Sequence, residues 1–224
     1  MSDGNSTTYR LQLKERIVDI AMRAFTRRGI RAVRMDDIAR ELGISKRTLY
    51  EIYDNKEELL YAGVEKYRVA NEQALLDDLG KMSNVIDIVL YSFHTKVDEF
   101  KRTSPQFYTD LERYPQVMSM LSRAKNHNRE RLMEVLKRGV SEGFFRDDVD
   151  YDIVVLLFEA IGIQVMGNHL YERFDIEQLF LNMVFPSVRG ICTLRGIEVL
   201  DRRLREEPLG QGFGADHSDK EGQP

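Results

Sequence analysis

Residues 44–56 read ISKRTLYEIYDNK, and this stretch decides how the amino-terminal part of the chain is interpreted. On a helix from Lys46 to Tyr53, Leu49 and Tyr53 stand four positions apart and point to the same side. The opposite side carries Arg47, Thr48 and Glu51, flanked by Lys46, Tyr50 and Ile52. Cations and hydroxyls of this kind bind phosphate groups and reach base edges in a major groove. The stretch therefore predicts either a helix that reads double-stranded DNA or, as the alternative, the solvated face of a small three-helix domain that buries Leu49 and Tyr53.

The residues just before this helix predict a partner helix at the spacing of a helix-turn-helix. An expected helix over Met35–Leu42 is joined to the reading helix through Gly43, which can take the left-handed turn conformation. Ala39 is small where the two helices must approach, and Ile44 is expected to fill the angle between them.

The residues after the reading helix predict the start of a long helix. Asn55 is the expected cap, and Glu58 stands three residues on as its partner in a capping box. Lys56 lies in the first turn, where free backbone N–H groups already attract anions, so we expect it to contact a phosphate beside the groove.

Composition and charge limit the classes of protein to consider. The 224 residues carry a net charge of −4, yet residues 10–53 hold eleven Lys or Arg against six Asp or Glu, a local charge of +5. This asymmetry indicates that only the amino-terminal part meets nucleic acid. One cysteine allows no intrachain disulfide, no apolar run is long enough to span a membrane, and the start lacks a secretory profile, so a cytoplasmic location is expected.

The apolar periodicity predicts an all-α protein of about nine helices. A helix-turn-helix domain is expected over residues 9–55, a larger helical domain over 56–200, and a disordered tail rich in Gly and charge over 201–224. Pro186 is expected to kink the last helix. The expected helices span residues 9–28, 35–42, 46–53, 55–79, 85–101, 105–113, 115–142, 150–171 and 176–196.

The last two long helices are apolar on more than one side. The run Ile153–Ile163 and the segment Leu179–Phe185 both exceed a single apolar stripe, so each helix must be buried on two sides. An identical pair of helices from a second subunit would cover the outer side, which predicts a homodimer with a four-helix interface. The alternative is the core of a large monomer.

The run from Arg16 to Glu58 resembles the DNA-binding domain of the tetracycline-repressor (TetR) family of bacterial transcription regulators. The similarity is colinear and rests on Ala24-Phe25 and Gly29, Asp37-Ile38-Ala39, Gly43, Thr48-Leu49-Tyr50 and Asn55-Lys56-Glu57-Glu58-Leu59. It covers about a fifth of the chain, and the remaining helices agree with the family in number and order.

The resemblance implies a role for individual residues of this sequence. Thr48 and Tyr50 become DNA contacts, Lys56 a phosphate contact, and Leu49 a core residue. Arg34 stands where the family commonly has a Thr or Ser helix cap, and here a phosphate contact is expected instead, with Asp36 favouring the helix start. The full set expected to bind DNA is Arg34, Lys46, Arg47, Thr48, Tyr50, Glu51 and Lys56.

The family also implies a cavity in the second domain for a small-molecule effector that alters the separation of the two DNA-reading heads. Aromatic and Met residues there indicate an apolar or aromatic compound. The expected lining residues combine apolar bulk with polar groups, and for each of them a core role is the competing interpretation: Tyr91, Phe93, His94, Phe107, Tyr108, Met118, Gln164 and Asn168. A second reading keeps the DNA-binding head but replaces the effector by a protein partner.

Enzymatic and metal-dependent functions are not expected. Gly139–Gly143 matches the G-x-S-x-G pattern of a serine hydrolase with Ser141 as nucleophile, but the preceding residues predict an amphipathic helix where a nucleophile elbow needs a strand. The four histidines lack the spacing of a helical metal pair, and no glycine-rich phosphate loop is present. Neither a metal nor a cofactor is predicted, and the remote hydrolase alternative requires an ester turnover that Ser141→Ala would abolish.

Overall fold

The computed structural model describes residues 3–79 and 82–207, and within them the regular structure is helical. The only β-type contact in these ranges is an isolated bridge between Phe145 and Cys192, so the predicted all-α class is confirmed. No helix in the described ranges is long and apolar enough to cross a membrane. The described residues divide into two compact units: unit 1 runs to Asp77 and includes Arg102–Asn126, and unit 2 holds the remainder.

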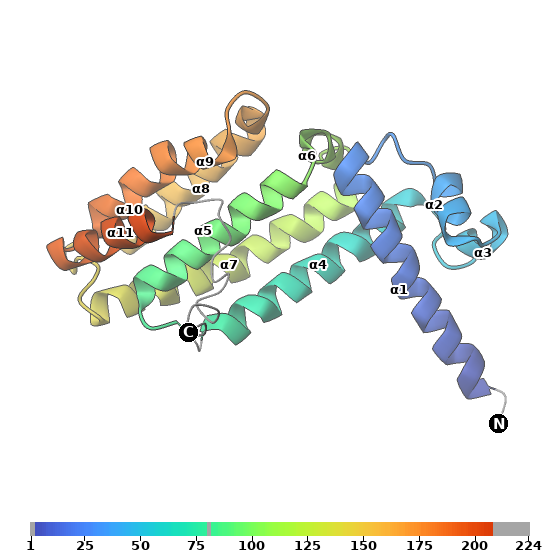
Figure 1. The fold of residues 1–224 in the computed structure, drawn as a ribbon, viewed down its shortest axis with the longest axis horizontal. Helices are drawn as coiled ribbons and strands as arrows, with labels where there is room; N and C mark the ends of the chain where they lie inside the picture. The colour runs from blue at the N-terminus through green and yellow to red at the C-terminus, as the bar shows by residue number, and fades with distance from the viewer. Residues whose placement is uncertain (1–2, 80–81, 208–224) are drawn as a thin grey trace, which may run out of the picture. The chain divides into compact units, whose positions relative to one another are not determined.

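Unit 1 contains the expected helix-turn-helix. Its helices are α1 (Asp3–Arg28), α2 (Met35–Leu42), α3 (Lys46–Tyr50), most of α4 (Lys56–Leu79), α6 (Pro105–Leu111) and the start of α7 (Pro115–Ser141). Helix α2 packs on both α1 and α3, and Figure 1 shows α2 and α3 side by side beside α1. The short α2–α3 pair is therefore held against a much longer helix.

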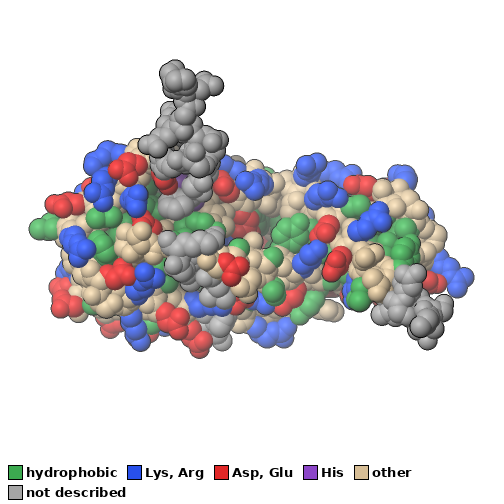
Figure 2. Space-filling view, turned by 60° about the horizontal axis from the view of Figure 1, so that its bottom comes forward, with side chains coloured by type: hydrophobic (Ala, Val, Ile, Leu, Met, Phe, Trp, Pro, Cys, Tyr) green, Lys and Arg blue, Asp and Glu red, His purple; other side chains and the backbone are tan. Residues whose placement is uncertain are grey.

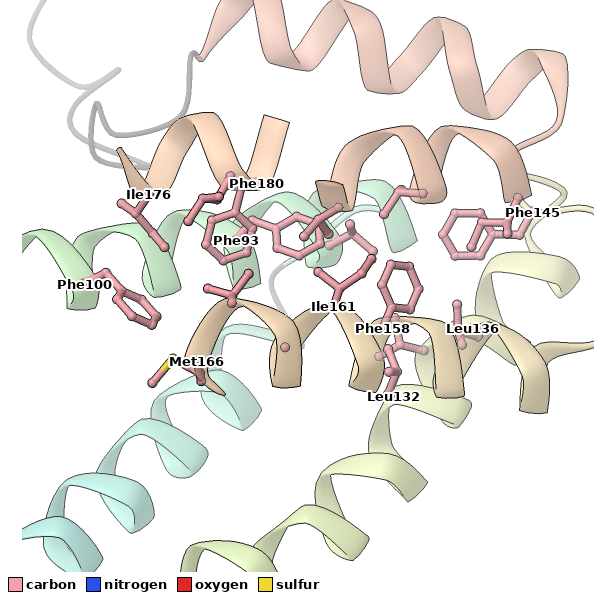
Figure 3. Close-up of a pocket in the computed structure, with 18 residues that line it drawn as sticks. Phe93, Phe100, Leu132, Leu136, Phe145, Phe158, Ile161, Met166, Ile176 and Phe180 are labelled. Carbon is pink, nitrogen blue, oxygen red and sulfur yellow. The ribbon is translucent and has the colours of Figure 1, made fainter. Parts of the chain in front are cut away.

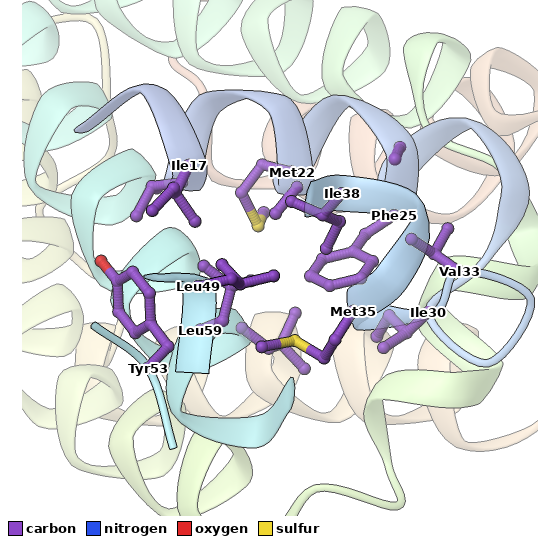
Figure 4. Close-up of a cluster of buried hydrophobic side chains, with 14 of the residues drawn as sticks. Ile17, Met22, Phe25, Ile30, Val33, Met35, Ile38, Leu49, Tyr53 and Leu59 are labelled. Carbon is purple, nitrogen blue, oxygen red and sulfur yellow. The ribbon is translucent and has the colours of Figure 1, made fainter. Parts of the chain in front are cut away.

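The core of unit 1 explains why these short helices are stable. Figure 4 shows Phe25 of α1, Ile38 of α2 and Leu49 of α3 pointing into one cluster, which Leu59 of α4 completes. All four side chains are essentially inaccessible to solvent. Because a five-residue helix cannot form alone in water, α3 depends on this burial for its stability.

Two glycines set the turns of unit 1, as their positions in the sequence predicted. Gly29 ends α1 with φ of 84° and Gly43 ends α2 with φ of 67°, both in the left-handed region. A Cβ atom on Gly29 would lie 2.6 Å from Cγ of Gln106, so the close approach of α6 also requires glycine there.

Helix α3 is shorter than expected, because it ends at Tyr50 and not at Tyr53. The N–H of Ile52 donates to the carbonyl of Leu49, three residues back, at 3.1 Å. The same carbonyl also accepts from the N–H of Tyr53 at 3.0 Å, so one bond of the α-helical spacing extends past the end of α3, and Tyr53 lies in the core.

Unit 2 is built from α5 (Val85–Arg102), the rest of α7, α8 (Tyr151–Gly167) and the carboxyl-terminal helices. A 3₁₀ turn, η1 (Leu170–Glu172), follows α8, so the expected helix over 150–171 is interrupted at Asn168. Gly143 ends α7 with φ of 74°, which agrees with the expected end of that helix.

The prediction of a single helix over residues 176–196 is wrong in detail. It is divided into α9 (Ile176–Leu179), a π-helical turn η2 (Phe180–Val184) and α10 (Phe185–Ile191). The N–H of Phe185 donates to the carbonyl of Phe180, five residues back. Pro186 lacks an N–H group and its ring crowds the preceding turn, which explains why the irregularity lies just before it.

A further helix lies in the segment expected to begin the tail. Helix α11 (Leu194–Glu206) starts at Thr193, whose hydroxyl accepts a hydrogen bond from the N–H of Gly196. Leu200 of this helix is buried in the core of unit 2. Residues 201–206 are therefore helical, and the rest of the expected tail, from residue 208, lies outside the described residues.

Candidate functional site

Helix α3 separates a buried side from an exposed side, as its periodicity predicted. Leu49 is 0% exposed and Tyr53 is 1% exposed, whereas Tyr50 is 45% exposed. Lys46, Arg47 and Glu51 are also exposed, and Thr48 is half-buried. The side chains proposed to read DNA thus lie together on the outer surface of unit 1.

The exposed cations on α3 are paired with carboxylates of the same unit. Lys46 forms an ion pair with Asp36 of α2, and Nε of Arg47 lies 2.8 Å from Oε1 of Glu51. The hydrogen bond that Arg47 donates to the carboxylate of Glu51 raises the pKa of Arg47. Because exposed ion pairs of this kind add little to stability, a phosphate oxygen can replace the carboxylate at small cost.

Thr48 is oriented by the cap of its own helix. The side-chain oxygen of Ser45 accepts a hydrogen bond from the N–H of Thr48 at 3.0 Å and lies 2.8 Å from Oγ1 of Thr48. Ser45 is therefore the N-cap of α3. This bond fixes the threonine hydroxyl near the amino-terminal end of the reading helix.

Arg34 occupies the N-cap position of α2 with its side chain exposed. Its backbone N–H donates to Oδ2 of Asp37 at 3.0 Å, and the guanidinium makes no capping hydrogen bond. The side chain is accordingly available at the surface of the helix-turn-helix, where the sequence predicted a phosphate contact.

Lys56, which the sequence predicted as a phosphate contact, makes two hydrogen bonds within unit 1. Its ammonium group donates to the carbonyls of Ile30 at 2.9 Å and Val33 at 2.7 Å, both in the loop between α1 and α2. Burial lowers the pKa of Lys56. The geometry gives Lys56 a structural role in the α1–α2 loop, which spacing along the sequence could not reveal because its partners lie 23 and 26 residues away.

Two basic residues of α1 that were not predicted as DNA contacts lie beside the end of α3. A guanidinium nitrogen of Arg10 donates to the carbonyl of Glu51 at 3.3 Å, and Nζ of Lys14 lies 5.5 Å from the ring centre of Tyr53. Their four-residue spacing places them on one side of α1, which was the only signal the sequence offered. Figure 2 shows basic and acidic side chains interspersed on one face of the molecule.

Unit 2 contains a cavity of about 320 Å³ enclosed by α5, α7, α8 and the α9–α10 segment. All of its eighteen lining residues are apolar side chains or glycine. Figure 3 shows Phe93 and Phe180 near its middle, with ring centres 5.5 Å apart. Of the residues predicted to line an effector pocket, Phe93 alone belongs to this lining.

The other predicted pocket residues lie elsewhere. Phe107 and Tyr108 pack in the core of unit 1, and Met118 is exposed in the same unit. Tyr91 and His94 belong to α5 but do not line the cavity, and burial lowers the pKa of His94. Gln164 and Asn168 are exposed on α8 and at its cap. Because α8 is apolar on more than one side, its sequence does not reveal which side faces the cavity, and Phe158, Ile161 and Val165 were missed.

Ser141 does not have the surroundings of a hydrolase nucleophile. It is the last residue of α7, and its hydroxyl donates to the carbonyl of Arg138 at 2.8 Å. A nucleophile elbow requires a strand before the serine, whereas α7 precedes it here.

The buried core of α1–α4, the glycine turn and the exposed side of α3 together define a DNA-binding protein of the helix-turn-helix class. Comparison with known families agrees: the model described as "Bacterial regulatory proteins, tetR family" matches residues 17–62. The transcriptional repressor KstR2 of Mycobacterium tuberculosis is 28% identical over 146 residues, which cover 62% of this chain and 72% of that protein. Residues 17–62 therefore carry the domain that this family model describes, and the chain is similar to a transcriptional repressor over most of its length.

Two further comparisons concern the amino-terminal domain and the fold. The negative transcriptional regulator IcaR of Staphylococcus epidermidis is 40% identical over 53 residues, 24% of this chain and 29% of that protein. A putative transcriptional regulator from Saccharomonospora viridis, solved in complex with choline, matches with a TM-score of 0.63 at 20% identity. That match covers 81% of this chain and 98% of the other, and it shows a shared fold.

Proposed function

We propose that this chain is a repressor that binds a near-palindromic operator as a homodimer, and that a small apolar molecule bound in unit 2 changes its affinity for the operator. The proposal that the chain binds DNA is supported mainly by the arrangement of side chains on α3. Tyr50 and Arg47 are exposed on one side of this helix, while Leu49 and Tyr53 anchor the other side in the core. Arg34, Lys46, Thr48 and Glu51 complete the proposed DNA-binding surface.

A homodimer follows from the apolar face of α8, which we define as Ile153, Leu156, Leu157, Ala160 and Ile163. These residues recur at three- and four-residue spacing, and all five are exposed in the single chain. Leu181, in the segment between α9 and α10, is exposed as well. Contiguous exposed apolar surface of this kind typically marks an interface, and a second copy presents the same surface to cover it.

The effector part rests on the cavity of unit 2. Its volume of about 320 Å³ lies at the lower end of the roughly 300–1,000 Å³ typical of small-molecule sites. The apolar walls favour an apolar ligand, in agreement with the compound class that the sequence indicated. A regulator controlled by a protein partner would need no ligand in this cavity.

A thermal-shift screen distinguishes the effector from the protein partner. A ligand that binds only the folded chain raises its melting temperature, and the stabilisation grows with the logarithm of the ligand concentration once that exceeds the Kd. We expect apolar compounds from a metabolite library to stabilise the chain and to change its affinity for operator DNA selected from a random duplex pool. A library without any stabilising compound would favour control by a protein partner.

A further inference from the structure

The lining of the cavity in unit 2 extends along more than two turns of each of two helices. On α8 the lining extends from Phe158 to Met166, about 12 Å at the usual rise of about 1.5 Å per residue. On α5 the lining extends from Val89 to Phe100, about 16 Å by the same measure.

The two ends of the cavity are different in character. Figure 3 shows Phe145 and Leu136 at one end, and Phe100, Met166 and Ile176 at the other. The segment between Met166 and Ile176 follows this second end along the chain, and its polar side chains include His169 and Tyr171.

Polar groups of that segment lie directly behind the lining at the Phe100 end. The ring centres of Phe100 and Tyr171 are 6.3 Å apart, and the hydroxyl of Tyr171 lies 2.8 Å from Nδ1 of His169. His169 has a left-handed backbone with φ of 50°, the only positive φ among the described residues other than glycine. The chain thus turns sharply here and brings hydroxyl and imidazole groups to this end.

We propose that the cavity binds an unbranched hydrocarbon chain whose single polar group lies at the end formed by Phe100, Met166 and Ile176. The inference rests on the proposed role of the cavity as the effector site. A polar group halfway along the chain would be buried against side chains that offer no hydrogen bond, which is costly. An unbranched chain matches the extent of the apolar lining along α5 and α8.

Isothermal titration calorimetry of the full chain with straight-chain primary alcohols, from hexan-1-ol to undecan-1-ol, tests the length of the ligand. Burial of each added methylene should tighten binding about fourfold. The gain should stop when the chain fills the cavity. An affinity that does not depend on chain length would overturn the inference.

The position of the polar group is tested with two isomers. Decan-1-ol and decan-5-ol contain the same atoms, but the second places its hydroxyl mid-chain. We expect decan-5-ol to bind at least about fivefold more weakly, since its hydroxyl is buried without a partner. Equal binding of the isomers, or tighter binding of the fused-ring alcohol decahydronaphthalen-2-ol, would contradict the proposal.

Gly162 offers a variant that shortens the cavity. It lines the cavity on α8, and a Cβ atom built there meets nothing within 4 Å. Gly162→Leu should therefore fold, and the affinity gain should stop at a shorter alcohol. Gly190→Ala also replaces a helical glycine with free space around it, but outside the lining, and it should leave the length dependence unchanged.

Operator binding is measured separately, so the two hypotheses can fail independently. Alcohols that bind with the expected length dependence but leave operator affinity unchanged would refute the effector role and retain the ligand class. Operator binding that persists while no alcohol binds would refute the ligand class and retain the DNA-binding role.

Discussion

At the scale of single residues, neighbouring positions of α3 have opposite roles. Leu49 is fully buried, so Leu49→Ala should lower the free energy of unfolding by about 2–5 kcal/mol. Tyr50 is exposed, and Tyr50→Ala should leave stability nearly unchanged while weakening operator binding by about 1–3 kcal/mol. Urea unfolding and fluorescence anisotropy on the same variants measure both quantities. Equal losses of stability in the two variants would refute the assignment of inner and outer sides.

Tyr53 is a second residue whose surroundings give a clear expectation. Its side chain is 1% exposed, and within the described chain its hydroxyl has no hydrogen-bond partner. Tyr53→Phe removes this unsatisfied group and keeps the ring, so the free energy of unfolding should stay the same or rise by about 1 kcal/mol. A loss above about 1 kcal/mol in urea unfolding at pH 8 would show that the hydroxyl is bonded.

The same residue predicts a loss of stability at alkaline pH. Burial raises the pKa of Tyr53 to about 12, above the value of about 10 expected in the unfolded chain. Above pH 10 the unfolded chain releases the Tyr53 proton while the folded chain retains it, and this favours the unfolded state. The free energy of unfolding is therefore unaffected by the ionisation of Tyr53 below pH 10 and falls as the pH rises towards 12. The difference in stability between wild type and Tyr53→Phe should shift in favour of the variant between pH 10 and pH 12.

Some residue roles can be predicted from the sequence, whereas others depend on contacts that only the folded chain forms. The cap at Asn55 was predicted from the sequence. Its side-chain oxygen accepts a hydrogen bond from the N–H of Glu58 at 2.9 Å, and the two residues are three positions apart, as the capping motif requires. The Glu58 carboxylate accepts from the N–H of Asp54, one position earlier than in the standard capping box. The hydrogen bonds of Lys56 could not be predicted, because the carbonyls that accept them are brought near only by the fold.

At the scale of elements, the α1–α2 loop is held from two sides within unit 1. Lys56 of α4 donates to two of its carbonyls, and Oδ2 of Asp110 on α6 accepts from the N–H of Arg31 at 2.8 Å. Asp110 is 1% exposed, and its other oxygen accepts from the side chain of Gln106. The loop leads directly into α2, so these bonds set where the helix-turn-helix begins.

Lys56→Met tests whether Lys56 supports this loop or contacts DNA. The variant keeps the apolar stem and loses two charge-assisted hydrogen bonds, so unfolding should become easier by about 1–3 kcal/mol. A structural role predicts an unchanged dependence of DNA affinity on salt. A phosphate contact predicts the opposite pattern, with stability retained and the salt slope reduced by about one.

The carboxyl-terminal helices show where prediction from sequence ends. The apolar pattern of residues 176–196 correctly indicates helical structure, and Pro186 marks the irregularity. The π-helical turn before it depends on how Phe180 and Phe185 pack against Phe93, at 5.5 and 5.0 Å between ring centres. Those contacts link residues far apart in the sequence, and for the same reason the lining of the cavity could not be predicted.

At the scale of the whole molecule, the homodimer is the assembly to be tested first. Leu157→Glu places a charge on the apolar face of α8, where Leu157 is 46% exposed in the single chain. If a second copy covers that face, an unpaired buried carboxylate should convert the dimer to monomer in light-scattering measurements. Leu194→Glu is the matched control, because Leu194 is 81% exposed on α11 and should have no effect. A dimer that persists in Leu157→Glu would place the interface elsewhere.

The most direct test of DNA reading by α3 is selection of bound fragments from a random duplex pool, with sequencing of the survivors and sizing of the complex. The wild-type chain should enrich a near-palindrome with half-sites about one helical turn, ~34 Å, or a multiple of it apart, bound by an even number of chains. Tyr50→Ala should lose that enrichment while folding normally. An enriched site that Tyr50→Ala selects equally well, or no enriched site at all, would contradict the proposal.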